Sequence, residues 1–411
     1  MKNSSDVLIL SAARTPAGKL LGGLSSLSAP ELGAIAVRAA VERSGIDPAS
    51  VYEVIMGQVI SAGAGQAPAR QAALKAGLPD SVGATAVNKV CGSGLKAVIV
   101  AANAITAGEA DVYVAGGMES MSNAPYLLPN ARQGMRYGDN VIKDAILKDG
   151  LWCSFQEWVM GEAAEFIAHK FEIGREEMDA YALRSHKRAA AATASGAFDA
   201  EIVPIAVEGR RGRAIRVAND ETIRAFFEED GGYSLQTSLA QLAQLPPAFS
   251  ADGRVTAGNA PGLNDGAAAL VVASPAAAAA QGLSPLARIV GYTHAPVDPQ
   301  WIFAAPARAI PLLLQEVGWS LADVDLIELN EAFAAQVLAN GADLQQQGYE
   351  WDWDKVNVHG GAIALGHPLG ASGARVLVTL LHALRQCNGR RGIAALCLGG
   401  GEAVAMAVEL L

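Results

Sequence analysis

The segment Cys91-Gly-Ser-Gly-Leu-Lys96 has a counterpart near the other end of the chain, Gly370-Ala-Ser-Gly-Ala-Arg375. After each segment come an apolar helical stretch, a strand-like run and a pair of glycines, in Val112-Tyr-Val-Ala-Gly-Gly117 and Ala395-Leu-Cys-Leu-Gly-Gly400. Self-similarity at two distant places, without a short repeating period, indicates one duplicated unit rather than a solenoid. We therefore predict two related halves in which helices and strands alternate.

Runs rich in Val and Ile alternate with Ala-rich helical stretches in both halves, which is typical of an α/β protein with a buried sheet. From about residue 118 to 254 the pattern changes to charged helical segments, which we interpret as an insertion into the first half. The predicted domains are therefore 1–272, including the insertion, and 282–411. Central strands are expected at residues 7–10, 54–56, 112–115, 326–329 and 393–398.

The composition of the 411-residue chain is that of a globular protein, with 51% hydrophobic and 18% charged residues. The 31 Lys and Arg against 41 Asp and Glu give a net charge of −10. This acidic balance argues against nucleic acid or an anionic membrane surface as a partner. An anionic ligand would need a local basic pocket.

Targeting signals and disulfide patterns are not evident in the sequence. The apolar run at 7–10 is too short for a signal peptide, and the tract at 267–280 contains Pro275 and is too short to span a membrane. The four cysteines are scattered and form no disulfide framework or zinc-type pair. We expect a cytoplasmic protein.

Two cysteines stand where they could do chemistry. Cys91 precedes a helix that opens with Gly92 and Ser93, so free backbone N–H groups and the positive end of the helix favour its thiolate. Cys397 is followed by Leu398-Gly-Gly-Gly401, where a substrate could approach backbone N–H donors. The alternative for each is an inert buried cysteine.

Two further residues are candidates because of their surroundings. His367 lies in a glycine-dense stretch, residues 359–373, and could serve as a base or a hydrogen-bond donor, although a lone histidine is often structural. Asn330 follows a predicted strand directly, at the strand end where α/β sheets bind ligands. Alternatively, Asn330 caps the next helix.

An arginine cluster within the insertion has two interpretations. Such runs of charge usually form a solvated face. Arginine also binds phosphate oxygens in a bidentate manner, so the cluster could hold a phosphate-bearing ligand. Its members are Arg210, Arg211, Arg213, Arg216 and Arg224.

Taken together, the motifs of this sequence resemble the thiolase family almost from end to end. The resemblance implies a thiolase-like, five-layered αβαβα fold built from two duplicated halves, with an inserted loop domain that covers the active site. It also implies a homodimer or homotetramer. The motifs that carry it are Val90-Cys-Gly-Ser-Gly94, Gly116-Gly-Met-Glu-Ser-Met121, Val255-Thr-Ala-Gly-Asn-Ala260, Gly262-Leu-Asn-Asp-Gly266, Asn330-Glu-Ala-Phe333, Gly366-His-Pro368 and Cys397-Leu-Gly-Gly-Gly401.

The resemblance also implies the catalytic roles. Cys91 is similar to the thiolase nucleophile and His367 to the residue that activates it, while Cys397 resembles the acid/base that acts on the α-carbon of the second thioester. Asn330, through a held water, together with His367 resembles one oxyanion hole. The backbone N–H groups of Cys91 and Gly399 resemble the other. Such chemistry requires no metal or redox cofactor, only coenzyme A thioesters as substrates.

Three positions depart from the short-chain thiolase pattern. Val159 stands where those enzymes carry a histidine, Ile302 where they carry a methionine, and Pro261 where a serine often touches pantetheine. These changes argue against a specificity for acetoacetyl-CoA and predict tolerance of longer acyl groups. The resemblance assigns substrate and CoA binding to Arg224, Met160, Ala257, Gly258, Phe333 and Ile302.

The sequence thus predicts an acyl-CoA C-acyltransferase of fatty acid metabolism that forms 3-oxoacyl-CoA and free CoA by a reversible, ping-pong Claisen condensation. Two alternatives stay open at this point. One is a decarboxylating condensing enzyme of the ketosynthase type, which would be expected to carry a second catalytic histidine in place of Cys397. The other is a scaffold protein that binds acyl-CoA without turnover.

Overall fold

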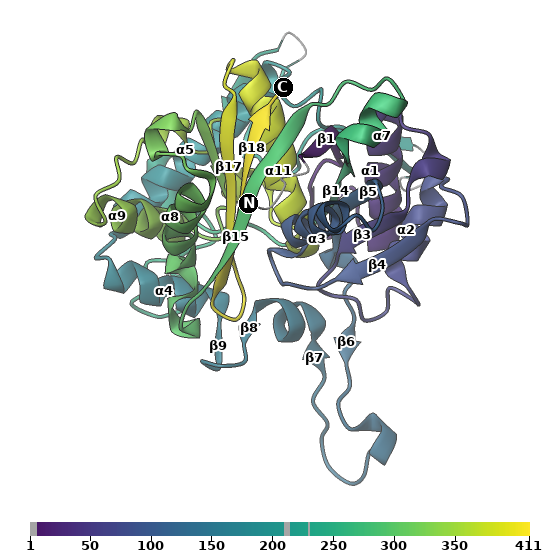
Figure 1. Ribbon diagram of the computed structural model, residues 1–411. Helices are drawn as coiled ribbons and strands as arrows, with labels where there is room; N and C mark the ends of the chain where they lie inside the picture. The colour runs from purple at the N-terminus through teal and green to yellow at the C-terminus, as the bar shows by residue number, and fades with distance from the viewer. Residues whose placement is uncertain (1–5, 209–213, 229–230) are drawn as a thin grey trace.

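The computed structural model describes residues 6–208, 214–228 and 231–411, and its centre is a ten-stranded mixed sheet (Figure 1). The strands follow the order β16-β17-β18-β15-β1-β14-β5-β3-β4, and β2 pairs with β14. Their bounds are β1 Val7–Arg14, β2 Gly18–Lys19, β3 Glu53–Gly57, β4 Gly83–Val87, β5 Val112–Ser120, β14 Asn264–Ala273, β15 Ala287–Pro296, β16 Leu326–Leu329, β17 Arg391–Leu398 and β18 Glu402–Leu410.

The sheet consists of two half-sheets joined at β1 and β15. In the first half β3 pairs in parallel with β4 and β5, and in the second half β16 pairs in parallel with β17. The antiparallel pairing of β1 with β15, with Val7 opposite Ile289, connects the halves. Each of the five strands expected from the sequence is present, and the duplicated halves are confirmed.

The helices form three layers around the half-sheets. Helices α3 (Ser93–Ala107) and α11 (Leu369–Gln386) pack against each other in the middle, between the two half-sheets. Helices α1 (Ala29–Ser44) and α2 (Pro68–Ala76) cover the outer face of the first half. Helices α8 (Ala305–Val317) and α9 (Ala334–Gln346) cover the second.

Strand β17 shows why a sheet in this position is apolar on both faces. Alternate residues Ile393, Ala395 and Cys397 belong to the outer core with α8 and α9. Their neighbours Leu396 and Leu398 belong to the central core with α3 and α11. Successive side chains of a strand point to opposite faces, so a strand buried on both sides loses the usual apolar–polar alternation.

Residues 90–107, which include the central helix α3, are by length and composition apolar enough to cross a membrane. Its residues Leu95, Val98 and Ile105 are buried between the half-sheets. A helix that is surrounded by other parts of a protein is hydrophobic on most sides, as a membrane helix is, because neither faces water. We therefore assign this segment to the core.

Within the insertion, short strands and helices follow one another. Its helices α4 and α5 pack into the core of the second half. Their bounds are β6 Tyr126–Leu127, β7 Lys143–Asp144, β8 Trp152–Cys153, β9 Trp158–Val159, α4 Met160–Lys170, α5 Arg175–Ala194, β10 Ile205–Glu208, β11 Ala214–Val217, β12 Ala225–Phe227, β13 Tyr233–Leu235 and α6 Leu239–Ala243. Beyond it come α7 Pro275–Ala280 and α10 Ala362–Leu365.

One part of the insertion extends away from the body as a long hairpin, whose base is β6 and β7 (Figure 1). Large apolar side chains along this hairpin are exposed, which is unusual for a segment without a partner. They are Tyr126, Leu128, Met135, Tyr137, Val141 and Ile142.

Candidate active site

A cavity of about 550 Å³ lies where the carboxyl ends of the parallel strands of both halves meet. Cys91 comes from the turn after β4, His367 from the loop before α11, and Cys397 and Gly399 from the end of β17. The insertion and the second half supply the remaining wall, mostly with apolar side chains. Four residues that the sequence assigned to catalysis thus line one cavity.

The turn that presents Cys91 is strained. Val90 has a φ of 47°, a left-handed conformation that costs a β-branched residue about 1–3 kcal/mol. Its N–H is held by Asn88 Oδ1 at 3.0 Å, and its carbonyl accepts the Ser93 hydroxyl at 2.6 Å. These two bonds force the chain around the corner, so that Cys91 projects into the cavity at the start of α3.

The expected lowering of the Cys91 pKa is wrong. Burial raises the pKa of the thiol to about 12, and the nearby Glu119 carboxylate adds to the increase. The backbone N–H groups of Cys91 and Gly399 point at the sulfur and oppose the shift, but desolvation is the larger effect. The resting nucleophile is therefore a neutral thiol that needs a base.

The His367 ring is held in one tautomer. The Ser372 hydroxyl donates to the Pro368 carbonyl at 2.8 Å, so at 2.6 Å it accepts the N–H of His367 Nδ1. Nε2 is then left with its lone pair. Burial lowers the pKa of His367 to about 3, and Arg375 contributes, so the ring is a neutral base.

The backbone around His367 fixes where the ring points. The His367 N–H donates to Asn264 Oδ1 at 2.9 Å. Gly366, immediately before it, has a φ of 108°, and a Cβ there would lie 2.7 Å from the Asn264 side chain. Only glycine fits this conformation and this approach, which explains part of the glycine density of the loop.

Cys397 and Gly399 lie on the other side of the cavity floor. Burial raises the pKa of Cys397 well above its usual value, and the nearby Cys91 thiol raises it further. The turn after them is tight: Gly401 has a φ of 85°, and a Cβ on it would lie 2.6 Å from Pro299 Cα. The turn therefore keeps the Gly399 N–H directed at the Cys91 sulfur.

Asn330 does not line the cavity wall. It follows β16 directly and is fully buried, and neither polar atom of its side chain has a partner among the described residues. The next helix begins at Ala334 with Phe333 at its N-cap, so Asn330 does not cap it. Its amide remains available to hold a small polar molecule, because buried polar atoms almost always have a hydrogen-bond partner.

Comparison with known proteins covers both halves of the chain. Residues 7–276 match the family description "Thiolase, N-terminal domain", and residues 283–410 match "Thiolase, C-terminal domain". The chain belongs to the thiolase family. The five-layered fold with its two duplicated halves is the thiolase fold.

Named relatives are similar over their whole length. The acetyl-CoA acetyltransferase of Escherichia coli K12 is 52% identical over 412 residues, which covers 100% of both chains. That of Cupriavidus necator is 51% identical over 405 residues, 98% of this chain and 99% of the relative. The crystal structure of the Bacillus anthracis acetyl-CoA acetyltransferase is 44% identical, with a TM-score of 0.92 and 99% coverage of both chains.

Most of the predicted binding residues of this thiolase line the cavity. Met160, Ala257, Phe333 and Ile302 are part of its wall. Gly258 is not: it is buried behind the wall, where a Cβ would lie 2.6 Å from Leu242 and Leu245.

The arginine cluster of the thiolase is divided by the fold. Arg224 precedes β12, and its guanidinium donates to the carbonyl of the cavity residue Ala257 at 2.8 Å. Arg216 is exposed on β11, whose hairpin packs with the outer core of the first half. The cluster members Arg210, Arg211 and Arg213 lie outside the described residues. Arg224 is therefore the described member of the cluster that lies beside the cavity.

Ser372 and Phe249 are among the residues of the site that the sequence analysis missed. Ser372 orients His367, and its place in the internal repeat, opposite Ser93, was a signal, because Ser93 likewise bonds a carbonyl one turn back. Phe249 covers the cavity from the insertion and stacks edge-on against Phe333 at 6.3 Å. Nothing in the pattern around Phe249 marks it, since an isolated aromatic residue near the surface is common.

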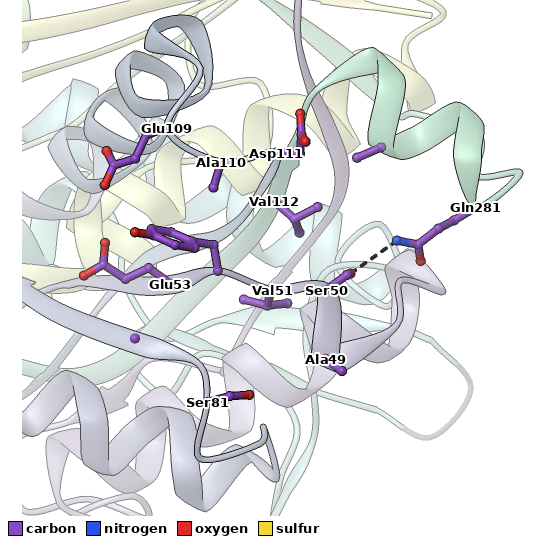
Figure 2. A pocket seen from close by; sticks show the side chains of 13 residues that line it. Ala49, Ser50, Val51, Glu53, Ser81, Glu109, Ala110, Asp111, Val112 and Gln281 are labelled. Atoms are coloured by element: carbon purple, nitrogen blue, oxygen red, sulfur yellow. Dashed lines mark hydrogen bonds between the residues drawn. The ribbon is translucent and has the colours of Figure 1, made fainter.

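A second hollow lies at the opposite, amino ends of the parallel strands (Figure 2). It has a volume of about 830 Å³, and the carboxylates of Glu53, Glu109 and Asp111 surround it. Their negative charge disfavours a ligand rich in phosphate, and the lining contains no thiol or imidazole. We therefore place the chemistry at the first cavity. Across residues 6–208, 214–228 and 231–411, no group of His, Cys, Asp and Glu is arranged to bind a metal ion.

Proposed function

We propose that this thiolase-family enzyme transfers the acyl group of one acyl-CoA to the α-carbon of acetyl-CoA, giving a 3-oxoacyl-CoA and free CoA, and that it also runs in reverse. One observation carries the proposal: Cys91, His367 and Cys397 face one cavity, with the Gly399 N–H directed at the nucleophilic sulfur. The names of the full-length relatives support the same reaction class.

In the first half-reaction Cys91 takes the acyl group. His367 Nε2 accepts the thiol proton, and the sulfur attacks the thioester carbonyl. The oxyanion that forms is held by the N–H groups of Cys91 and Gly399, a contribution typically worth about 10²–10³ in rate. The CoA thiolate leaves with the proton of Cys397, so that the acyl-enzyme contains a Cys397 thiolate and a His367 imidazolium.

In the second half-reaction the carbon–carbon bond forms. The Cys397 thiolate removes an α-proton from acetyl-CoA, and His367 together with a water held by Asn330 stabilises the enolate. The enolate carbon attacks the Cys91 thioester, Cys91 leaves as a thiolate, and the imidazolium returns its proton. Every proton and electron pair is accounted for by these side chains and the two thioesters, so no metal or redox cofactor is needed.

The shape of the cavity supports a substrate longer than acetoacetyl-CoA. Val159 and Ile302 present apolar surface, and Leu147 and Phe249 extend it. Each methylene that an acyl chain buries there adds about 0.8 kcal/mol until the pocket is full. Thiolysis rates measured over a series of 3-oxoacyl-CoA chain lengths should peak beyond four carbons, and activity confined to acetoacetyl-CoA would contradict this part of the proposal.

We propose a homodimer or homotetramer for the thiolase. Strand β4 ends the sheet, and its residues are largely exposed, so its open edge can pair with a second copy. The apolar side chains of the β6–β7 hairpin offer a separate contact. Light scattering on the purified protein should give a multiple of the 42.3 kDa chain mass. A monomer would exclude both contacts.

We propose a cytoplasmic location for the enzyme. All four of its cysteines are free thiols, and a nucleophilic Cys91 stays active only where thiols remain reduced. Fusion of a fluorescent protein to the chain would test this location.

The reaction itself is tested by incubating the purified enzyme with acetyl-CoA and following two products. Release of free CoA together with a 3-oxoacyl-CoA supports the proposal. Tight binding of acyl-CoA without release of CoA would instead make the chain a scaffold. Cys91→Ser serves as the matched control, because it keeps the volume of the side chain nearly constant but removes the thiol.

A further inference from the structure

A carboxylate without an assigned role lies beneath the two catalytic segments. Glu119 is the eighth residue of β5 and is fully buried. It lies on the face that also carries Tyr113 and Ala115, toward the central helices. The backbone there is very close to α11, since a Cβ on Gly117 would lie 1.9 Å from the Gly370 carbonyl oxygen.

The Glu119 carboxylate accepts three backbone hydrogen bonds from two separate segments. Oε2 accepts the N–H groups of Gly370 at 2.9 Å and Val59 at 3.0 Å, and Oε1 accepts the N–H of Ile60 at 3.2 Å. The Gly370 N–H belongs to the first turn of α11, where the helix has no acceptor of its own. A carboxylate at this end of a helix is also favoured by the helix dipole.

The bond to Gly370 fixes the segment that carries the base. The first turn of α11 is separated from His367 only by Pro368, and it contains Ser372, which holds the His367 Nδ1. Because one short turn carries both contacts, the position of its backbone determines where the imidazole lies.

The bonds to Val59 and Ile60 fix the segment next to the nucleophile. The Val59 carbonyl accepts the Asn88 amide at 3.4 Å, and Asn88 in turn holds the strained Val90 before Cys91. Val59 and Ile60 also form one apolar cluster with Leu369, against which Cys91 packs. The carboxylate thus connects the turn of Cys91 to the loop of His367 through backbone on both sides.

We infer that Glu119 is a positioning residue that sets the separation between the Cys91 thiol and the His367 imidazole. The inference rests on the proposed roles of these two residues. Glu119 does not touch the cavity and moves no proton of the substrate. It acts through the three backbone N–H groups, and as a carboxylate it accepts all three without a proton of its own that would need an acceptor.

The pKa of the Glu119 carboxylate lies in the pH range in which enzymes work. Burial raises the pKa of Glu119 to about 7, the three N–H groups oppose the shift, and Asp265 adds to it. The titratable groups that face Glu119 are Asp265 from β14 and Cys91 from the turn before α3. Below its pKa the group carries a proton that the three donors cannot accept, so positioning weakens as the pH falls through about 7.

The test compares Glu119→Gln and Glu119→Asp with wild type by kcat, KM and the pH dependence of kcat. The matched control is Asp325→Asn, since Asp325 also accepts two backbone N–H groups, from Arg390 and Arg391, but near the amino end of β16, on the side of the sheet away from the cavity. We expect Glu119→Gln to lower kcat by about 10²-fold, the cost of a misplacement of about 1 Å. KM should change little, and the decline of kcat below about pH 7 should disappear. Asp325→Asn should lower the melting temperature and leave kcat and its pH profile unchanged.

Glu119→Asp keeps the charge on a shorter side chain, so it should retain the pH profile while lowering kcat less than Glu119→Gln. If Glu119→Gln does not fold, the kcat of Glu119→Asp tests the inference instead, and a wild-type kcat in that variant overturns it. A folded Glu119→Gln with wild-type kcat and pH profile also overturns it. Cys91→Ser is measured in parallel: turnover retained there would overturn the assigned nucleophile, whereas a normal Glu119 variant beside an inactive Cys91→Ser overturns the positioning role alone.

Discussion

Replacing Ser372 by alanine tests whether the orientation of His367 limits the reaction. Ser372 is 1% exposed, and its hydroxyl is the acceptor for the Nδ1 proton of the ring at 2.6 Å. Without it the buried Nδ1–H loses its partner. When His367 accepts the Cys91 proton, that N–H belongs to an imidazolium, whose hydrogen bonds are stronger than those of the neutral ring. The loss is therefore larger in the transition state than in the resting enzyme.

The magnitude follows from the cost of an unpartnered buried donor, about 1–3 kcal/mol. Because about 1.4 kcal/mol corresponds to a factor of ten, kcat should fall by about 5–150-fold. KM should stay close to that of the wild type, since Ser372 is not part of the cavity wall. The assay is steady-state thiolysis with both thioester and CoA varied.

Thr379→Val is the matched control for Ser372→Ala. Thr379 lies on the same helix and is equally buried, but its hydroxyl bonds Glu201 rather than a catalytic residue. The control should lose stability and keep kcat. A kcat for Ser372→Ala within experimental error of the wild type would refute the reasoning, and so would an equal loss in both variants.

Three further predictions concern the cysteines and the CoA site. Iodoacetamide should alkylate Cys91 slowly near neutral pH and progressively faster up to pH 9 and above, because burial raises its pKa to about 12; a rate that is already constant above pH 6 would indicate a thiolate paired with His367 instead. In Cys397→Ala, acetylation of the enzyme should remain detectable while condensation falls by about 10²–10⁴-fold, the value of a positioned base; the opposite pattern would exchange the roles of the two cysteines. Arg224→Ala should raise the KM for CoA substrates more than it lowers kcat. Arg216→Ala, on the exposed strand β11, should change neither constant. An unaltered KM in Arg224→Ala would mean that Arg224 is a solvated surface residue and does not bind CoA.

The fold could be predicted from the sequence because its strongest signal is a long-range one. The repeat of the segments that begin at Cys91 and Gly370 predicted two α/β halves, and the structure has both segments at the start of the paired central helices. Strand β17 carries apolar residues on both faces, such as Ile393 on one and Leu396 on the other. In the sequence this appears as a continuous apolar run. Such runs predict where the strands lie and that they are buried on both faces.

The electrostatics of the site could not be predicted in the same way. The position of Cys91 before α3 indicated a lowered pKa, but the desolvation that overrides the helix depends on surrounding segments far apart in the chain. Glu119 was quoted within a motif, but its role escaped notice because its three donors come from residues 59, 60 and 370. The role of Asn330 depended on where the next helix begins, and helix boundaries are the least predictable part of an element.

The central claim is that Cys91 carries the acyl group, and the most direct test is to locate that group. The enzyme is mixed with acetyl-CoA, quenched in acid within the first turnover, digested and analysed by mass spectrometry. The account predicts an acetyl group on the peptide that contains Cys91 in the wild type and in Cys397→Ala, and no acetylated cysteine in Cys91→Ser. An acetyl group on Cys397 or Cys153 with Cys91 unmodified, or turnover without any acetylated residue, would contradict it.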